Sequence, residues 1–436
     1  MGTHSELAER HRRVLPSWLA LYYDQPIELV EGKGCFVRDG EGNEYIDFFG
    51  GILTTSIGYG VEEFVEAVRS QVGRMVHTST LYLVRPMVEL AERIAGLSGI
   101  EDAKVFFTNS GSEAIDTALM MCCAARRSNQ VLALRNSYHG RSFAATGVTG
   151  NRAWSPSSFT PLSVSWLHNG DRLRGVFAGL DDDQVCRAAA ADLREVLATT
   201  TSGDVACFIA EPVQGVGGFV VPPDGFFGAL QEVLAEQGIL YISDEVQTGW
   251  GRTGEHFWGY QAHGVRPDLL VFAKGLANGL AIGGVVGRAS VVDAFGSNSI
   301  STFGGNPLAT SGALATLDYI LDHGLQANAL AVGRQVHERL AGAASSSRIV
   351  ADVRGKGLML GIELVEPGTL TPSAKLANEV LQRARERGVL VGKGGLYGNV
   401  LRVSPPMSVS REVAYEGTSR LLDALSAVGG ERASDD

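Results

Sequence analysis

The 436-residue sequence has few cysteines, few lysines and no long apolar segment. Its five cysteines are an odd number, Cys122 and Cys123 are adjacent, and no Cys-x-x-Cys pair occurs. This pattern suits neither a disulfide framework nor a zinc site, so we expect reduced thiols, a cytoplasmic location and no metal. No apolar run is long enough to span a bilayer, and residues 1–15 lack the apolar core of a secretory signal.

An excess of basic charge is also missing, because 37 Lys and Arg face 48 Asp and Glu for a net charge of -11. An acidic chain repels phosphate backbones, so we expect no nucleic-acid partner and no membrane partner. The one basic cluster, residues 10–13, indicates a solvated helix face, with membrane or RNA contact as the lesser alternative. Apolar residues make up 45% of the chain, which is ordinary for a folded protein with a sizeable core.

Short apolar segments, each followed by turn residues and a helix, recur through the middle of the chain. They are residues 104–107, 131–134, 205–210, 239–243 and 269–273. Buried strands that alternate with helices are typical of βαβ units and a mostly parallel sheet. We therefore expect an α/β fold: a large domain with a mostly parallel mixed sheet flanked by helices, and a smaller α+β domain from both termini.

Two residues at the ends of predicted strands are the first candidates for chemistry. Lys274 follows the buried run 269–273, where desolvation lowers the pKa of a lysine and makes its amine a nucleophile towards carbonyl groups. Asp244 follows the run 239–243, and strand ends of such sheets share one ligand crevice. There its carboxylate could keep a heteroaromatic nitrogen protonated. The alternatives are a lysine that snorkels to solvent and an aspartate that caps a loop.

Two turns that follow strands could complete the same site. The turn 109–114 opens a helix, so its backbone N–H groups, two hydroxyls and the helix dipole either bind an anion or only cap the helix. After the run 131–134, Tyr138 could stack on a flat ring and Arg141 could bind a carboxylate. His139 is either a base or a hydrogen-bonded structural residue. A nucleophilic lysine, an acid, an anion site and a stacking aromatic are together what pyridoxal phosphate requires.

On these residues the chain resembles the class-III pyridoxal-phosphate aminotransferases of fold type I, over about residues 34–406. The most specific stretch is 244–249, followed by Lys274 thirty residues after Asp244. Residues 109–114, 211–215, 302–307, 401–403 and 405–406 match as well. Within the class the chain is most similar to mitochondrial-type alanine–glyoxylate aminotransferases, through residues 77–80, 253–259 and 354–359.

The resemblance implies a role for each matching residue. Lys274 forms the Schiff base with the cofactor and moves the proton, while Asp244 pairs with the pyridine nitrogen. The other implied cofactor-binding residues are Gly111 and Ser112 at the phosphate, Tyr138 on the ring, Gln247 at the ring hydroxyl, His139, Glu211, and the partner subunit's Thr302. Arg402 and Arg141 are the substrate-binding candidates, and the family forms a homodimer, or a dimer of dimers, with shared active sites.

The implied domains are residues 1–57 as the N-terminal segment of the small domain, 58–315 as the large cofactor-binding domain, and 316–436 as the C-terminal small domain. Within them the pattern predicts a hairpin over 34–49 and helices over 61–72, 88–97, 113–127, 186–199, 226–237 and 373–387, with two long helices around 310–342. Asp181–Asp183 is predicted to cap a helix and not to bind a metal.

Three positions bear on the substrate. Several ω-amino-acid members have a glutamate that masks the substrate-binding arginine where this chain has Val216, which favours substrates with a carboxylate for Arg402 in both half-reactions. Arg141 supports the opposite conclusion, an ω-amino-acid substrate, because it occupies the position where those same enzymes bind a carboxylate. Tyr59 stands where the family usually has histidine, and it is expected only to pack a helix start.

The resulting prediction is a two-step transamination from an amino acid or amine to a 2-oxo acid such as pyruvate, glyoxylate or 2-oxoglutarate. A pyridoxal-phosphate lyase or decarboxylase stays open as the alternative, because those reactions use the same cofactor residues. A binding module would not need Lys274, Asp244 and Gln247 together. A nicotinamide oxidoreductase is disfavoured because no Gly-x-Gly-x-x-Gly follows a predicted strand.

Overall fold

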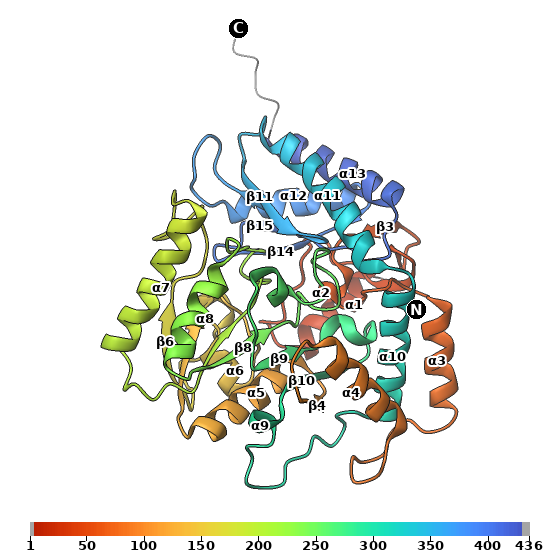
Figure 1. Ribbon diagram of the computed structural model, residues 1–436. Helices are drawn as coiled ribbons and strands as arrows, with labels where there is room; N and C mark the ends of the chain where they lie inside the picture. Colours follow the sequence, from red (N-terminus) through yellow and green to blue (C-terminus); the bar gives the residue numbers. More distant parts are fainter. Residues whose placement is uncertain (1–3, 430–436) are drawn as a thin grey trace.

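The computed structural model describes residues 4–429, and its larger domain is built on one seven-stranded sheet (Figure 1). In spatial order the strands are β4 (Ala103–Thr108), β10 (Gly283–Arg288), β9 (Leu269–Phe272), β8 (Leu240–Asp244), β7 (Cys207–Ala210), β5 (Gln130–Leu134) and β6 (Ser163–Leu167). The strands from β9 to β6 pair in parallel, whereas β10 is antiparallel to both β4 and β9. The predicted mostly parallel mixed sheet is confirmed.

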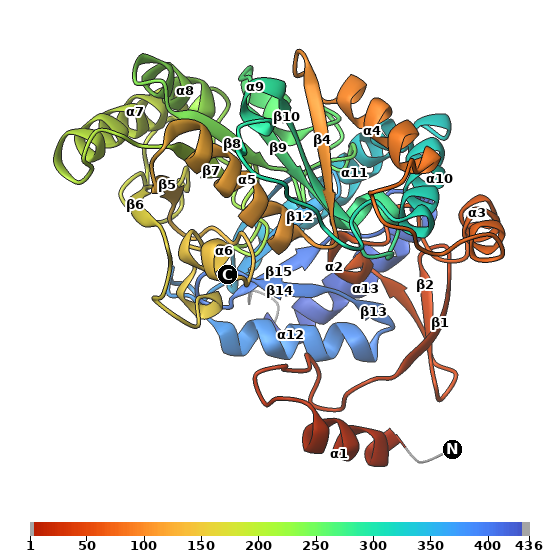
Figure 2. The ribbon, with the colours of Figure 1, turned by 90° about the horizontal axis from the view of Figure 1, so that it is seen from below.

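Both faces of this sheet are buried, which explains why its strands appear in the sequence as unbroken apolar runs. In β5, Val131 and Ala133 pack in one core with α5 (Gly111–Arg126). Leu132 and Leu134 belong to the other core, which contains residues of α7 (Asp182–Thr199) and α8 (Phe226–Glu236). Figure 2 shows α5 on one side of the strands and α7 and α8 on the other.

The remaining helices of the large domain lie around its edges. They are α3 (Glu62–Val72), α4 (Arg85–Leu97), α6 (Phe143–Gly147), α9 (Ala289–Val292) and α10 (Pro307–Asp322), with the 3-10 helices η1 (Arg152–Trp154), η2 (Gly259–His263) and η3 (Lys274–Ala277). The predicted cap of α7 is confirmed, because the Asp181 carboxylate accepts a hydrogen bond from the Gln184 backbone N–H at 2.8 Å.

The smaller domain combines chain segments from both ends. One sheet has the order β1 (Leu29–Lys33), β2 (Phe36–Asp39), β3 (Glu44–Asp47) and β13 (Val389–Leu390), and β13 pairs in parallel with β3. A second sheet is antiparallel, with the order β11 (Val350–Lys356), β12 (Met359–Leu364), β15 (Val400–Val403) and β14 (Gly392–Gly394). Its helices are α11 (Leu325–Ala344), α12 (Ala374–Glu386) and α13 (Arg411–Gly429), while α1 (His4–Val14) lies beyond α12 (Figure 2).

Most of the predicted elements are present, and the strands that the sequence pattern predicts over 357–364, 389–391 and 400–403 correspond to β12, β13 and β15. The elements that were not predicted are β1, β6, β10, β11, β14, α2 (Gly50–Leu53), α6, α9 and α13. The central strand β10 is the largest omission, and its three glycines explain it, because they interrupt the apolar run. A Cβ at Gly284 would lie 2.5 Å from the Phe272 ring, so β10 needs glycine in order to fit against β9. The predicted domain boundaries stay predictions, and residue 316 lies within α10.

No helix among residues 4–429 is long and apolar enough to cross a membrane. In the same part of the chain, no group of three or more His, Cys, Asp or Glu side chains could hold a metal ion. All five cysteines are free thiols.

Candidate active site

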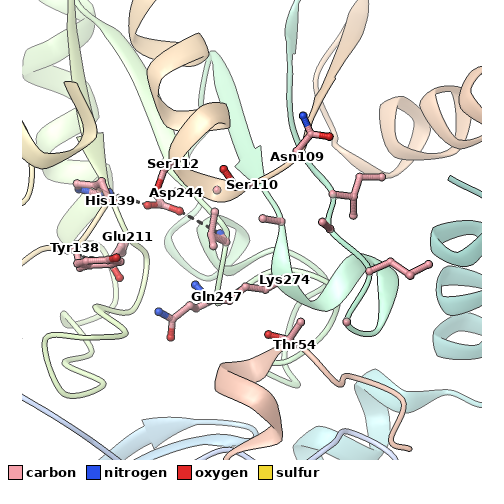
Figure 3. A pocket seen from close by; sticks show the side chains of 18 residues that line it. Thr54, Asn109, Ser110, Ser112, Tyr138, His139, Glu211, Asp244, Gln247 and Lys274 are labelled. Atoms are coloured by element: carbon pink, nitrogen blue, oxygen red, sulfur yellow. Dashed lines mark hydrogen bonds and ion pairs between the residues drawn. The ribbon is translucent and has the colours of Figure 1, made fainter. Parts of the chain in front are cut away.

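A cavity of about 300 Å³ opens where the carboxyl ends of β5, β7, β8 and β9 meet the N-terminus of α5. Eight of the residues predicted for the site line it: Gly111, Ser112, Tyr138, His139, Glu211, Asp244, Gln247 and Lys274. Figure 3 shows Ser112, Asp244, Gln247 and Lys274 around the centre, with Tyr138, His139 and Glu211 together at one side. The parallel strands therefore bring together residues that are as many as 163 positions apart in the sequence, from 111 to 274.

Lys274 begins η3, with one residue between it and the end of β9, and has a backbone φ of 39° that few residues other than glycine adopt. Burial lowers the pKa of Lys274 to about 8, against the raising effect of Asp244. The charge of Arg402 lowers this pKa as well, and Glu211 raises it. A substantial fraction of the amine is therefore neutral near pH 8, which is the nucleophilic form.

Asp244 is the last residue of β8 and is only 4% exposed. One carboxylate oxygen lies 2.7 Å from Nδ1 of His139, and the other accepts a hydrogen bond from the Val246 N–H at 3.1 Å. Since a carboxylate accepts, the ring proton of His139 is assigned to Nδ1. His139 therefore orients Asp244, as the structural alternative proposed, and its buried Nε2 has no partner among residues 4–429.

Glu211 joins two of the loops that form the cavity. Its carboxylate accepts hydrogen bonds from the backbone N–H groups of Tyr138 at 2.9 Å and Gly215 at 2.8 Å. Burial raises the pKa of Glu211 to about 7, with His139 opposing this rise and Asp244 adding to it. Glu211 thus holds the loop after β5, which carries Tyr138, against the loop after β7.

The N-terminus of α5 forms the opposite wall. Ser110 caps the helix, since its hydroxyl accepts a hydrogen bond from the Glu113 N–H at 3.2 Å. The Ser112 hydroxyl accepts one from the Arg141 N–H at 3.1 Å, and a Cβ at Gly140 would lie 2.5 Å from that hydroxyl. The first N–H groups of a helix lack partners within the helix, so this wall is suited to an anion such as a phosphate.

Arg402 reaches the site from β15 of the small domain and is 2% exposed. Its Nη2 donates a hydrogen bond to Oε1 of Gln247 at 2.8 Å. The guanidinium carbon lies 4.6 Å from the ring centre of Phe219 and 5.4 Å from that of Phe49. Burial lowers the pKa of Arg402 to about 10. This buried cation, next to the cavity, is suited to a carboxylate ligand.

A left-handed turn, α2 (Gly50–Leu53), brings Phe49 to Arg402 and Thr54 to the cavity wall. Its four residues have φ values between 55° and 65°, and Ile52 at 65° is β-branched and therefore strained. The carboxylate of Asp47 stabilises the turn by accepting hydrogen bonds from the N–H groups of residues 49 and 50. Tyr59 donates its hydroxyl to the same carboxylate at 2.7 Å, so it supports this turn, and its ring packs against the cluster of Val37, Tyr45 and Leu390.

Three predicted residues do not line the cavity: Arg402, which donates a hydrogen bond to Gln247 in the cavity wall, Thr302 and Arg141. Thr302 is exposed, and the guanidinium of Arg141 is near the ring of Trp18, at 5.7 Å. Their roles stay predictions. The sequence reasoning did not assign Thr54, Val246 or the loop 279–282, which also line the cavity, or Phe49 and Phe219, which flank Arg402. These are ordinary apolar and small residues, and no motif distinguished them.

The residues present fit the cofactor that the sequence predicts. The cavity contains an amine with a lowered pKa, a buried carboxylate held by His139, and a helix N-terminus for a phosphate. A cavity of about 300 Å³ is also of the size that encloses a small cofactor.

Comparison with known proteins agrees with this geometry. The model of the family "Aminotransferase class-III" matches residues 21–425. The chain is 38% identical to alanine–glyoxylate aminotransferase 2 homolog 2, mitochondrial, of Arabidopsis thaliana, over 94% of this chain and 84% of that protein. It is 35% identical to alanine/serine racemase of Pyrococcus horikoshii, over 96% and 90% of the two chains. A thermostable (S)-enantioselective omega-transaminase from Thermomicrobium roseum superposes with a TM-score of 0.90 at 32% identity, over 98% and 99%.

Proposed function

This chain belongs to the class-III aminotransferase family and is an enzyme that uses pyridoxal 5'-phosphate. We propose a role for each residue of the site in moving an amino group to a 2-oxo acid. The observation that supports the proposal is the approach of the Lys274 amine and the Asp244 carboxylate to one cavity beside the N-terminus of α5. The family and its aminotransferase relatives favour transamination over the lyase or decarboxylase alternative.

The cofactor, when bound here, supplies an electron sink for the carbon that loses a proton. Asp244 would hold the ring nitrogen of the cofactor and keep it protonated, because its negative charge makes the protonated nitrogen more stable. His139 keeps that carboxylate in place through the 2.7 Å contact. The N-terminus of α5, with Gly111 and Ser112, would bind the phosphate.

Lys274 acts as the acid and base. Its neutral amine is the nucleophile that would hold the cofactor. The same amine, when it is free, would take the proton from the substrate α-carbon and later give it back. A pKa of about 8 is suited to both transfers near neutral pH.

Arg402 binds the substrate carboxylate, and the rings of Phe49 and Phe219 exclude water from that contact. Both an α-amino acid and a 2-oxo acid place a carboxylate next to the reacting carbon. Pyruvate, glyoxylate and 2-oxoglutarate are therefore the acceptors that we propose.

The test is to remove the reacting amine and to ask whether transfer depends on an acceptor. We expect Lys274→Ala to reduce turnover by at least 10⁴-fold while a folded protein still binds the cofactor without covalent attachment. In the parent protein, an amino donor should form more than one equivalent of its keto product per site only when a 2-oxo acid becomes aminated. Release of ammonia without an acceptor would show a lyase, and loss of optical activity in L-alanine without an acceptor would show a racemase.

The assembly that we propose is a homodimer whose partner subunit's Thr302 reaches the phosphate. Two exposed apolar segments support this: residues 81–83, of which Leu83 is 98% exposed, and Phe303, which is 59% exposed and follows Thr302. Patches of this kind mark protein interfaces. Light scattering should give the mass of two chains, and a monomer with full activity would contradict the proposal. The free cysteines support the cytoplasmic location that we also propose.

A further inference from the structure

Arg402 is a buried cation without an ion pair. Within residues 4–429, its guanidinium has one hydrogen bond, to the Gln247 amide, and Nε has none. Phe49 and Phe219 flank it and offer only the faces of their rings. The buried Val216 belongs to the loop after Glu211, and its carbonyl accepts a hydrogen bond from the Gly395 N–H. The acceptor that offsets the desolvation of Arg402 is thus a neutral amide and not a carboxylate.

The orientation of the Gln247 amide follows from chemistry. A guanidinium only donates, so the atom that faces Arg402 at 2.8 Å must be the amide oxygen. The amide nitrogen is left to the cavity, which Gln247 also lines. The backbone of Gly215 packs directly against the amide, because a Cβ at that position would overlap it. The position of Gln247 is therefore fixed by Arg402 on one side and by backbone on the other.

A neutral acceptor can be exchanged, whereas a carboxylate on the protein would resist exchange. A carboxylate carries a full opposite charge and can accept two parallel hydrogen bonds from a guanidinium, whereas the amide oxygen is neutral, so a substrate carboxylate displaces the amide of Gln247. When the substrate has no carboxylate, the amide returns and the buried cation keeps an acceptor.

We propose that Gln247 is the exchangeable partner of Arg402 and determines how strongly the site selects between α-amino acids and primary amines that lack a carboxylate. This inference rests on the proposed function, because it concerns the donors of the same reaction. Gln247 lets the site accept both classes of donor. An α-amino acid is bound through Arg402, and an amine is accepted because Gln247 then supplies the hydrogen-bond acceptor for that arginine.

Two variants of equal size test the exchange. Gln247→Met removes the acceptor, so a carboxylate no longer has to displace an amide. Gln247→Glu replaces it with a carboxylate that pairs with Arg402. A purely structural or cofactor-holding role for Gln247 predicts that both variants are impaired in the same direction, whereas the exchange predicts opposite changes.

The first readout is the binding of butanoate, a carboxylate without an amine, to the cofactor-loaded protein by calorimetry. We expect Gln247→Met to bind it at least as tightly as the parent protein, and Gln247→Glu to bind it at least 30-fold more weakly. Arg402→Met is the control and should not bind it. Equal weakening in both Gln247 variants would overturn the proposal.

The second readout is the first half-reaction with a matched pair, 2-aminobutanoate and 2-aminobutane, which differ only in carboxylate against methyl. The ratio of their rates within one variant cancels general effects on the cofactor. We expect this ratio to rise at least 10-fold in Gln247→Met and to fall at least 10-fold in Gln247→Glu; an unchanged ratio in both would reject the exchange. A parent protein that transfers no amino group would refute the proposed function, while the butanoate titration would still test Gln247.

Discussion

Two arginines of the same sheet have opposite surroundings. Arg354 on β11 and Arg402 on β15 both pair with Gly361 of the strand between them, so they lie in one row on one face. Both side chains contact the loop 215–219: Arg354 donates from Nε to the Gly218 carbonyl at 2.9 Å, and Arg402 lies over the Phe219 ring. Yet Arg354 also pairs with Asp352 at 2.9 Å and Glu363 at 2.7 Å, whereas Arg402 pairs with no carboxylate among residues 4–429.

The difference assigns Arg354 to the stability of the fold and Arg402 to the binding of a ligand. The carboxylates around Arg354 raise its pKa, and burial lowers that of Arg402 to about 10. Glu363 also pairs with Arg174 at 2.5 Å, so the ion pairs on this side of the row form one network. The network fixes the sheet against the loop, and the unpaired arginine two strands away is left for a ligand.

The largest effect should come from Arg402→Met, which removes the cation but keeps a similar volume. We expect kcat/KM for pyruvate to fall by 10²- to 10³-fold, about 3–4 kcal/mol, because the charge-assisted contacts with the carboxylate are lost. The free energy of unfolding should stay equal or rise, since an unpaired buried charge is removed. Steady-state kinetics and denaturant unfolding of the same sample measure both. A destabilised protein with intact kcat/KM would assign Arg402 to the fold instead.

Arg354→Met should give the reverse result. It leaves the buried Glu363 with Arg174 as its remaining ion-pair partner, so we expect a loss of roughly 2–3 kcal/mol in unfolding free energy and a kcat/KM within about threefold of the parent. The pKa of Glu363 is lowered against burial by Arg354, followed by Arg174. Its stabilisation is therefore present above the ordinary glutamate pKa and is lost as pH falls below it. This acid-dependent loss should be smaller in the variant, which unfolding curves between pH 3 and 7 would show.

The sequence predicted most of the fold and the polar part of the site. Asp244 and Lys274 could be found because each follows an apolar run, and parallel strand ends meet at one edge. The Arg354–Glu363 network could not be found, because a pairing across antiparallel strands leaves no fixed spacing in the sequence. Gln247 was assigned to the cofactor, but its contact with Arg402 depends on how the small domain sits on the large one. That packing is decided by residues such as Phe219, which carry no motif.

Gly361→Ala tests whether the two arginines depend on the close approach of the strand between them to the loop 215–219. A Cβ at Gly361 would lie 2.9 Å from the Gly218 carbonyl oxygen and 3.2 Å from a methyl group of Val400, so the loop 215–219 must shift. We expect a cost of about 1–2 kcal/mol in unfolding free energy and a three- to tenfold loss in kcat/KM, because the loop contacts both arginines. Gly296→Ala is a matched control, since nothing lies within 4 Å of its added Cβ. Equal effects in the two variants would show that the row does not depend on this close approach.

The smallest expected effect concerns the pKa of Lys274, which depends on the charge of Arg402 but not on that of Arg354. Arg402 is among the charges that lower the pKa of Lys274 to about 8, after the larger effect of burial, so Arg402→Met should raise that pKa by less than about one unit. Arg354→Met should leave it unchanged, because carboxylates neutralise Arg354. The rate at which cofactor-free protein attaches pyridoxal phosphate to Lys274 requires the neutral amine. Its midpoint should therefore lie near pH 8 in the parent and move upward only in Arg402→Met. An equal shift in both variants would mean that the ion pairs do not screen Arg354, and the contrast between the two arginines would then be one of packing and not of charge.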